Sequence, residues 1–331
     1  MKKHLAVLLL TVSVLALFSF HDEALAATKW KTGIAAAPVN GRHPIYQALL
    51  FLDEEISTAT GGKYGVEIFH SGQLGGERDI MEGVQLGTYK FGAVPSSYTA
   101  ALSDIFLILE LPYLFKDYDH FIKVLRSDVG KEMLATLEDH NLVGLGYCIN
   151  GIYSLCNGKR PVLKASDLSG LKIRAMDAPI QLECVNTLGG RGVPMAWGEV
   201  YTGLQQGTID GVLTINSGFS SARLFEVNKH LTMLQIFMLP SPIFVNKDYW
   251  ESLPEVDREQ IKEGVRKAED RHYVDFLAQD DEALDICKKE GMQIVTEFDR
   301  ASFEKALEPV YGKYQGEYGD IVRRIRAMAD E

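Results

Sequence analysis

Hydrophobic residues in the first third of the chain recur with two alternating periods, which predicts a repeated strand–helix pattern. After Pro44, a residue suited to the first turn of a helix, apolar residues lie three or four positions apart until Gly61-Gly62. Tyr64 and Ile68 belong to a short stretch that alternates with period two, as a strand does. The expected elements are strands at 30–35, 64–68 and 91–94, and helices that begin at residue 44 and span 77–86.

The same order of elements returns in the second half of the chain. We expect strands at 171–176, 192–195 and 210–214, separated by helices at 178–188 and 197–206. A β-α-β-α-β order favours an open, mostly parallel sheet covered by helices, and two such units predict two α/β domains. Ligands of such sheets bind beyond the carboxyl ends of the strands, so we expect a ligand cleft between the domains.

A third pattern follows Leu253. Between Pro254 and Gly291 lie about 36 residues with Gly264 as the only glycine, roughly three times the usual helix length. A coiled coil is the alternative, but the heptad pattern is not sustained. The segment therefore predicts one long helix that spans both domains.

The N-terminus has the three parts of a secretory signal peptide. Lys2 and Lys3 form a basic head, an apolar run of about 16 residues follows, and 24–26 (ALA) supply a small-residue cleavage site. An uncleaved anchor is the weaker alternative, because the run is short for a membrane span. We expect residues 1–26 to be removed and a soluble mature chain of about 305 residues to be exported to a bacterial periplasm.

The composition and charge of the chain exclude several classes of function. Hydrophobic residues make up 46% of the chain and charged residues 24%, as in ordinary globular proteins, and the net charge is −11. This acidic balance argues against nucleic acid and anionic lipid as partners, and an anionic ligand would need a local basic site. No nucleophile, zinc or phosphate-loop motif is present, so we expect no cofactor and no metal. Cys148, Cys156, Cys184 and Cys287 leave three full disulfide pairings or free thiols open.

Arg174 is the strongest candidate for the basic site. It lies inside the apolar, strand-like segment 171–176. Arginine keeps its charge in proteins, is rarely buried without a partner, and offers a planar fork of donors that matches a carboxylate. On a strand that ends at a cleft it can anchor an anion. The alternative is a structural salt bridge to an acidic residue of the same chain.

Short segments spread over nearly the whole mature chain carry a family resemblance. They are 72–78 (GQLGGER), 111–117 (LPYLFKD), 159–161 (KRP), 167–174 (DLSGLKIR), 194–196 (PMA), 198–201 (GEVY), 204–207 (LQQG) and 210–211 (DG). In this order they resemble the extracytoplasmic solute-binding proteins of tripartite ATP-independent periplasmic (TRAP) transporters, of the dicarboxylate-binding type. The resemblance implies a two-domain fold like that of periplasmic binding proteins, with a long helix across both domains. It also implies a salt bridge from Arg174 to a substrate carboxylate.

Two departures from the family pattern bear on the ligand. Tyr153 stands where many members carry a second arginine, and Thr214 stands at the usual asparagine position, with Asn216 two residues further on. One arginine suits one carboxylate, so we expect a monocarboxylate with an apolar or aromatic body, with a C4-dicarboxylate as the alternative. Tyr153, Trp197 and Phe219 could offer aromatic surface, although core packing is the alternative for each.

Four further residues complete the candidate ligand site. His43 and Arg42 lie in the first strand-to-helix loop, Arg78 lies near the start of the second helix, and Ser96 follows the third expected strand. A second cation from Arg42 or Arg78 would restore the dicarboxylate alternative. We expect domain I to comprise 27–150 and about 240–280, and domain II to comprise 151–239 and about 281–331.

These features together predict a periplasmic substrate-binding protein that acts as a monomer. It captures an organic acid, closes around it, and presents it to the membrane subunits of a TRAP transporter. A secreted enzyme on the same scaffold is the alternative from another class, which a turnover assay would reveal, but no nucleophile–base pair supports it. A sensory domain that acts through a partner is a third possibility.

Overall fold

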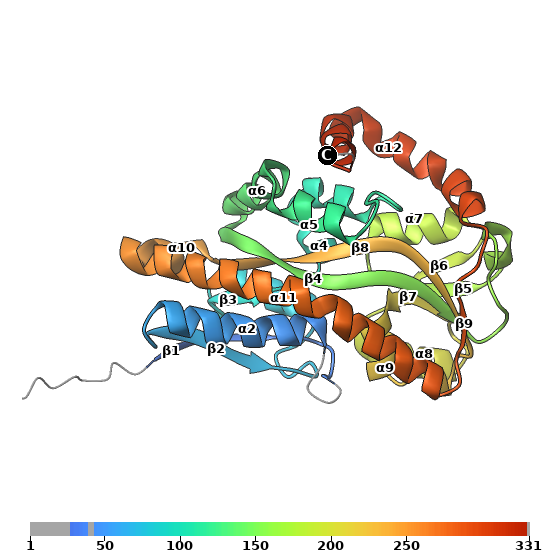
Figure 1. Ribbon diagram of the computed structural model, residues 1–331, viewed down its shortest axis with the longest axis horizontal. Helices are drawn as coiled ribbons and strands as arrows, with labels where there is room; N and C mark the ends of the chain where they lie inside the picture. Colours follow the sequence, from blue (N-terminus) through green and yellow to red (C-terminus); the bar gives the residue numbers. More distant parts are fainter. Residues whose placement is uncertain (1–26, 39–42, 330–331) are drawn as a thin grey trace, which may run out of the picture.

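The computed structural model describes residues 27–38 and 43–329, so the expected signal peptide and Arg42 lie outside the described residues (Figure 1). Every expected strand and helix is present within a few residues of its predicted ends. The strands are β1 (Thr28–Gly33), β2 (Tyr64–Phe69), β3 (Phe91–Ala93), β4 (Leu142–Asn157), β5 (Lys172–Ala175), β6 (Arg191–Pro194), β7 (Gly211–Ile215), β8 (His230–Asn246) and β9 (Gln293–Val295). The α-helices are α2 (Pro44–Ala59), α3 (Glu77–Gln85), α4 (Ser96–Thr99), α5 (Tyr118–Arg126), α6 (Asp128–Ala135), α7 (Pro179–Thr187), α8 (Val200–Gln205), α9 (Asn216–Ser221), α10 (Lys247–Ser252), α11 (Glu255–Lys289) and α12 (Arg300–Ala327). Short 3₁₀ helices are η2 (Asp104–Glu110), η3 (Thr136–His140), η4 (Ala165–Leu168), η5 (Trp197–Glu199) and η6 (Leu224–Glu226).

The described strands form a seven-stranded sheet and a separate two-stranded sheet. β1 and β2 pair in parallel, and the larger sheet has the order β3-β8-β4-β7-β5-β6, with β9 beside β8. β5 is parallel to β6 and β7, whereas β3–β8, β4–β8 and β4–β7 are antiparallel pairs. The expectation of a mostly parallel sheet is therefore wrong, because the larger sheet is mixed.

The antiparallel pairs come from β4 and β8, two long strands that the period-two pattern does not reveal. They have 16 and 17 residues and pair from Leu142 opposite Asn246 to Asn157 opposite His230. Both are buried on both faces over most of their length, so their apolar residues do not alternate with polar ones. In Figure 1 they run between β1–β3 with α2 on one side and β5–β7 with α7–α9 on the other. The predicted domain boundaries fall inside these strands and inside α11, and they stay predictions.

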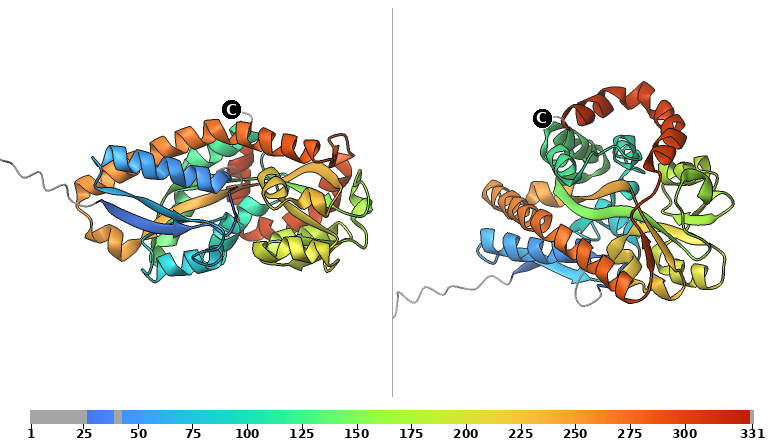
Figure 2. Two further views of the ribbon diagram at one scale, coloured as in Figure 1. Left: turned by 90° about the horizontal axis from the view of Figure 1, so that it is seen from below. Right: turned by 45° about the vertical axis from the view of Figure 1, so that its right-hand side comes forward.

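The long helix expected after Leu253 is α11, a single helix of 35 residues. It packs against α2, β4 and α9, and so braces both halves of the molecule (Figure 2). Gly264 allows the close approach of α2, because a Cβ atom at this position would lie 2.7 Å from the Cα of Ile56. Helices can approach this closely only where one presents no side chain.

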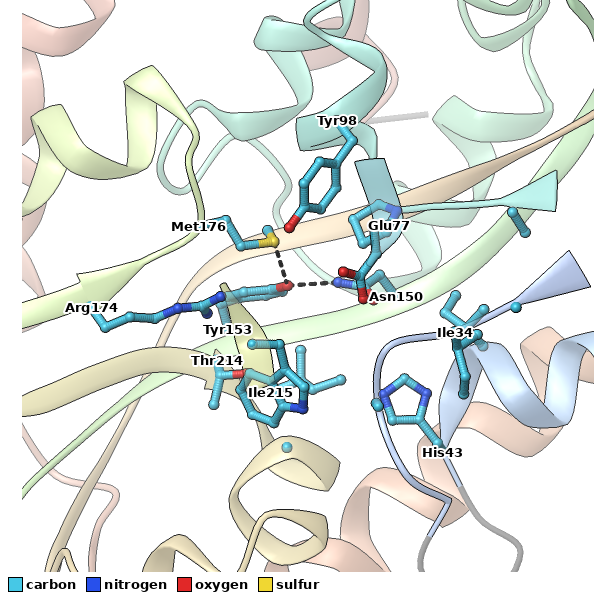
Figure 3. Close-up of a pocket in the computed structure, with 17 residues that line it drawn as sticks. Ile34, His43, Glu77, Tyr98, Asn150, Tyr153, Arg174, Met176, Thr214 and Ile215 are labelled. Carbon is cyan, nitrogen blue, oxygen red and sulfur yellow. Dashed lines mark hydrogen bonds between the residues drawn. The ribbon is translucent and has the colours of Figure 1, made fainter. Parts of the chain in front are cut away.

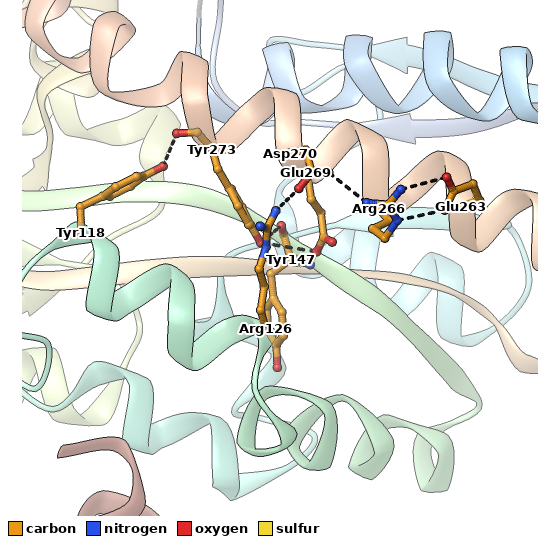
Figure 4. Close-up of polar contacts among 8 residues, drawn as sticks. All are labelled: Tyr118, Arg126, Tyr147, Glu263, Arg266, Glu269, Asp270 and Tyr273. Atoms are coloured by element: carbon orange, nitrogen blue, oxygen red, sulfur yellow. Dashed lines mark hydrogen bonds and ion pairs between the residues drawn. The ribbon is translucent and has the colours of Figure 1, made fainter. Parts of the chain in front are cut away.

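A polar cluster fixes α11 to β4 and α5 (Figure 4). A carboxylate oxygen of Glu269 accepts the backbone N–H of Tyr147 at 2.6 Å, and the Tyr273 hydroxyl donates to the Tyr147 carbonyl at 2.9 Å. Arg126 pairs with Asp270 and lies 4.7 Å from the centre of the Tyr273 ring. Burial raises the pKa of Glu269 to about 7.

Cys148, Cys156, Cys184 and Cys287 are all buried free thiols, so of the alternatives left open by the sequence the structure shows no disulfide among them.

Candidate ligand-binding site

A pocket lies where the carboxyl ends of β1, β3, β5 and β7 meet, with an empty volume of about 610 Å³ that is partly open to solvent (Figure 3). Its lining residues are Gly33, Ile34, Ala36, His43, Ile45, Glu77, Ala93, Pro95, Tyr98, Asn150, Tyr153, Arg174, Met176, Trp197, Thr214, Ile215 and Gly218. The expected position beyond the strand ends, between two strand–helix units, is confirmed.

Arg174 is the cation of this pocket. It lies on β5 between β6 and β7, and 2% of its surface is exposed. Its Nε donates to the carbonyl oxygen of Met195 at 3.0 Å, and its guanidinium carbon lies 5.6 Å from the centre of the Trp197 ring. Within the described part of the chain no carboxylate lies at ion-pair distance, so the structural salt bridge considered above is not formed.

Burial lowers the pKa of Arg174, although not enough to discharge a guanidinium at neutral pH. A charge held in this way costs free energy because water no longer solvates it. An anion that entered the pocket would offset that cost through a bidentate pair.

Tyr153 and Asn150 extend from β4 into the pocket. The Tyr153 hydroxyl accepts a hydrogen bond from Nδ2 of Asn150 at 2.6 Å and lies 3.8 Å from the sulfur of Met176, as Figure 3 shows. Burial raises the pKa of Tyr153, so its phenol is neutral at physiological pH. The pocket therefore has a neutral hydrogen-bonding group where the family pattern often has a second arginine.

Glu77 and Tyr98 also line the pocket, and the sequence pattern does not single out either of them. Glu77 is the first residue of α3 and is half-buried. Desolvation raises the pKa of its carboxyl group, while nearby backbone amides and the charge of Arg174 oppose this shift. Burial raises the pKa of Tyr98 to about 12. Glu77 directly follows the strand-to-helix loop of the GQLGGER segment, and this position is the signal that could have found it.

His43, Trp197 and Gly218 shape the remaining walls. His43 is buried directly before α2, and burial lowers the pKa of its imidazole to about 4, so the ring is neutral. Trp197 is half-buried and faces the guanidinium of Arg174. Gly218 leaves room in the pocket, because a Cβ atom there would lie 2.8 Å from Oγ1 of Thr214 and 3.0 Å from Cη2 of Trp197.

The structure thus brings together five of the predicted site residues: Arg174, Tyr153, Thr214, Trp197 and His43. Phe219 is fully buried in the core around α9, so it shows the core-packing alternative and not a pocket wall. Asn216 points to α11, where its Nδ2 donates to a carboxylate oxygen of Asp280 at 2.9 Å. The reason is geometric, since successive residues of α9 point in different directions around the helix.

Ser96 and Arg78 are also outside the pocket lining. Ser96 is fully buried at the start of α4. Arg78 is exposed and forms an ion pair of 3.2 Å with Asp177. Because these two residues follow Glu77 and Met176 in the sequence, their ion pair links opposite walls at the edge of the pocket. Arg42 lies outside the described residues.

The electrostatic character of the site is simple. Among the described lining residues, Arg174 is the only cationic side chain and Glu77 the only carboxylate. The described residues contain no group of three or more His, Cys, Asp and Glu side chains placed to hold a metal ion.

None of the described helices is both long enough and apolar enough to cross a bilayer.

Two α/β units, a long bracing helix and a pocket between strand ends define the class of two-domain solute-binding proteins. The chain belongs to the bacterial extracellular solute-binding protein family 7, whose sequence profile matches residues 36–317. This family includes the TRAP solute-binding proteins, so the resemblance, the transport class and the periplasmic location are confirmed.

Three relatives illustrate the family. A solute-binding protein of Verminephrobacter eiseniae is 32% identical over 266 residues, which cover 80% of this chain and 79% of the relative. The C4-dicarboxylate-binding periplasmic protein of Rhodobacter capsulatus is 30% identical, over 82% and 83% of the two chains. The crystal structure of a TRAP periplasmic solute-binding protein from Polaromonas sp. JS666, bound to D-erythronate, is 31% identical. It has a TM-score of 0.85 and covers 91% of this chain and 98% of its own.

Proposed function

We propose that this protein captures an organic monocarboxylate through an ion pair with Arg174 and delivers it to the membrane subunits of a TRAP transporter. The buried, unpaired guanidinium of Arg174 is the observation that carries the proposal. A buried charge needs a partner, and the described residues supply none at ion-pair distance. A ligand carboxylate would supply it, as the salt bridge expected from the family resemblance requires.

The same pocket disfavours a second ligand carboxylate. Tyr153 and His43 are neutral, so neither can compensate another buried negative charge. Glu77 carries a carboxyl group on the pocket wall and would repel it. A monocarboxylate avoids both costs. The relative from Polaromonas is bound to D-erythronate, which has one carboxylate.

The body of the acid would lie against a largely apolar wall. Ile34, Ile45, Met176, Trp197 and Ile215 all line the pocket. Each Å² of apolar ligand surface that they cover contributes about 25 cal/mol to binding. This wall supports the expectation that the ligand presents an apolar face to the protein.

The proposed role is capture without chemical conversion. The chain's family and its structural relatives are solute-binding proteins. Ligand bound between Arg174 of one wall and residues of the opposite wall would favour a closed arrangement of the two domains, because only that arrangement offers both sets of contacts. The Arg78–Asp177 ion pair at the pocket edge would add a contact specific to it.

A thermal-shift screen tests the proposal. Short hydroxy, keto and branched monocarboxylates are compared with succinate and malate at equal concentrations. We expect the largest stabilisation from a monocarboxylate, about 2.7 kcal/mol at a hundredfold excess over its dissociation constant. The bound acid should be recovered unchanged by mass spectrometry. Stabilisation by C4-dicarboxylates alone would refute the monocarboxylate proposal, and a converted product would favour an enzyme.

A further inference from the structure

We propose that a protonated Glu110 side chain holds the two α/β units together behind the ligand pocket, so that domain closure and ligand capture are coupled to the uptake of a proton. Glu110 does not line the pocket, so it is a positioning residue that acts through its neighbours. The link to ligand capture rests on the proposed function, whereas the contact between the units does not.

Glu110 lies where elements of both units meet. It is the last residue of η2 and is fully buried. Its carboxyl group interacts with the side chains of Ser97, on α4, and Gln181, on α7. Because α4 follows β3 and α7 follows β5, these two partners come from different units. Nε2 of Gln181 donates to Oγ of Ser97 at 3.2 Å, and this hydrogen bond already joins the units.

The hydrogen bonds of this cluster are complete only if Glu110 carries a proton. Both carboxyl oxygens of Glu110 and Oε1 of Gln181 are buried, and none of the three has a hydrogen-bond partner among the described residues. The Ser97 hydroxyl can donate only one hydrogen, and an ionised carboxylate donates none. A protonated Glu110 donates to Oε1 of Gln181 and accepts from Ser97, which closes a ring of three hydrogen bonds.

No charged side chain compensates an ionised Glu110 within the described part of the chain. The titratable groups that interact with it electrostatically are Tyr153 on β4, Cys184 on α7 and Tyr314 on α12. Burial raises the pKa of all three, so they are neutral at physiological pH. β8 also packs against η2, and its only titratable side chain is that of His230, at its first residue. Burial without a cation therefore raises the pKa of Glu110 to about 7.

The ring adjoins the ligand pocket on both sides. Tyr98 follows Ser97 in α4, Met176 lies shortly before α7, and both line the pocket (Figure 3). If α4 and α7 separate, the pocket widens and water reaches Glu110, whose pKa then returns to its ordinary value of about 4.5. The closed form has the higher pKa, so its extra stability is lost as the pH rises from about 4.5 to about 7. Ligand affinity should fall over the same range.

Isothermal calorimetry at pH 6 and pH 8 tests the coupling, with D-erythronate as the probe. The proteins are the unmodified chain, Glu110→Gln and Glu269→Gln. Glutamine at position 110 keeps the ring at every pH, because its amide donates to Gln181 and its carbonyl accepts from Ser97. Glu269→Gln is the matched control. Burial also raises the pKa of Glu269 to about 7, but this residue joins α11 to β4 and not one unit to the other.

We expect the unmodified protein to bind D-erythronate about tenfold more tightly at pH 6 than at pH 8, as one carboxyl that gains its proton on closure requires. Buffers of different ionisation enthalpy should show the uptake of close to one proton per ligand at pH 6. Glu110→Gln should bind equally well at both pH values and take up no proton. Glu269→Gln should retain the tenfold difference.

Hydrogen exchange followed by mass spectrometry tests the contact without any ligand. After correction for the intrinsic pH dependence of exchange, peptides that cover 96–110 and 179–187 should exchange faster at pH 8 than at pH 6 in the unmodified protein. In Glu110→Gln their corrected rates should be equal, because the ring persists.

Several outcomes would overturn the inference. They are equal affinity of the unmodified protein at both pH values, a tenfold difference that persists in Glu110→Gln, or its loss in Glu269→Gln. A pH-independent affinity that rises with Na⁺ concentration would show that a cation, and not a proton, neutralises Glu110. If neither D-erythronate nor any acid of the thermal-shift screen binds, the proposed function fails. Hydrogen exchange then still decides whether Glu110 holds the units together.

Discussion

Replacing Arg174 by methionine should abolish ligand binding without harming the unliganded fold. Methionine has a similar length, and its side chain suits the apolar surroundings of β5. The substitution removes one hydrogen bond, from Nε to Met195, and a guanidinium that is 2% exposed and has no acidic partner at ion-pair distance among the described residues. The lost bond contributes about 1 kcal/mol, whereas the buried charge costs several. The unliganded variant should therefore be at least as stable as the unmodified protein.

The effect on binding has the opposite sign. Breaking a buried, hydrogen-bonded charge pair costs about 2–5 kcal/mol, which corresponds to a loss of affinity of roughly 30- to 4,000-fold. A ligand at a hundredfold excess stabilises the unmodified protein by about 2.7 kcal/mol. At the same ligand concentration the stabilisation of the variant should be at most about 0.9 kcal/mol.

Chemical denaturation with and without ligand measures both effects, and calorimetry gives the affinity directly. Arg191→Met, at an exposed position on the neighbouring strand β6, is the matched control and should leave binding unchanged. The reasoning is refuted if Arg174→Met binds the acid within threefold of the unmodified protein. It is also refuted if the unliganded variant is markedly destabilised, since the arginine would then be structural.

Two further predictions concern the fold and the shape of the pocket. Glu110 is fully buried, and burial raises its pKa to about 7. The folded state therefore keeps a proton that the unfolded state releases above about pH 4.5. As a result, the free energy of unfolding falls as the pH rises from about 4.5 to about 7. Urea denaturation should show that Glu110→Gln is more stable than the unmodified protein at pH 8, by up to about 3 kcal/mol, and equally stable at pH 4. The same difference in stability at both pH values would contradict this prediction. Gly218→Val should weaken ligand binding by about five- to 150-fold, because its side chain would meet Thr214 and Trp197. Gly312→Val is the control and should leave affinity unchanged, because a Cβ atom there meets nothing within 4 Å. If Gly218→Val also leaves affinity unchanged, the ligand binds elsewhere.

The sequence by itself determined most of the local structure. Its helical and period-two spacings predict the elements of both strand–helix units, and the glycine-poor segment after Pro254 predicts α11. These features depend on residues close together in the sequence, which is why periodicity reveals them. Arg174 also stands out from sequence alone, because a permanent charge inside an apolar strand needs a special explanation.

The tertiary structure decided the sheet and the composition of the pocket. β4 and β8 are buried on both faces over most of their length, so only their pairing with each other shows that they are strands that cross the molecule. Glu77 looks like an ordinary acidic residue at a helix start until the fold places it across a pocket from Arg174. Asn216 and Phe219 look like pocket residues until the direction of α9 turns them toward α11 and the core. Periodicity reports which residues are buried, whereas the packing of distant segments decides whether they are buried against the ligand or against the protein itself.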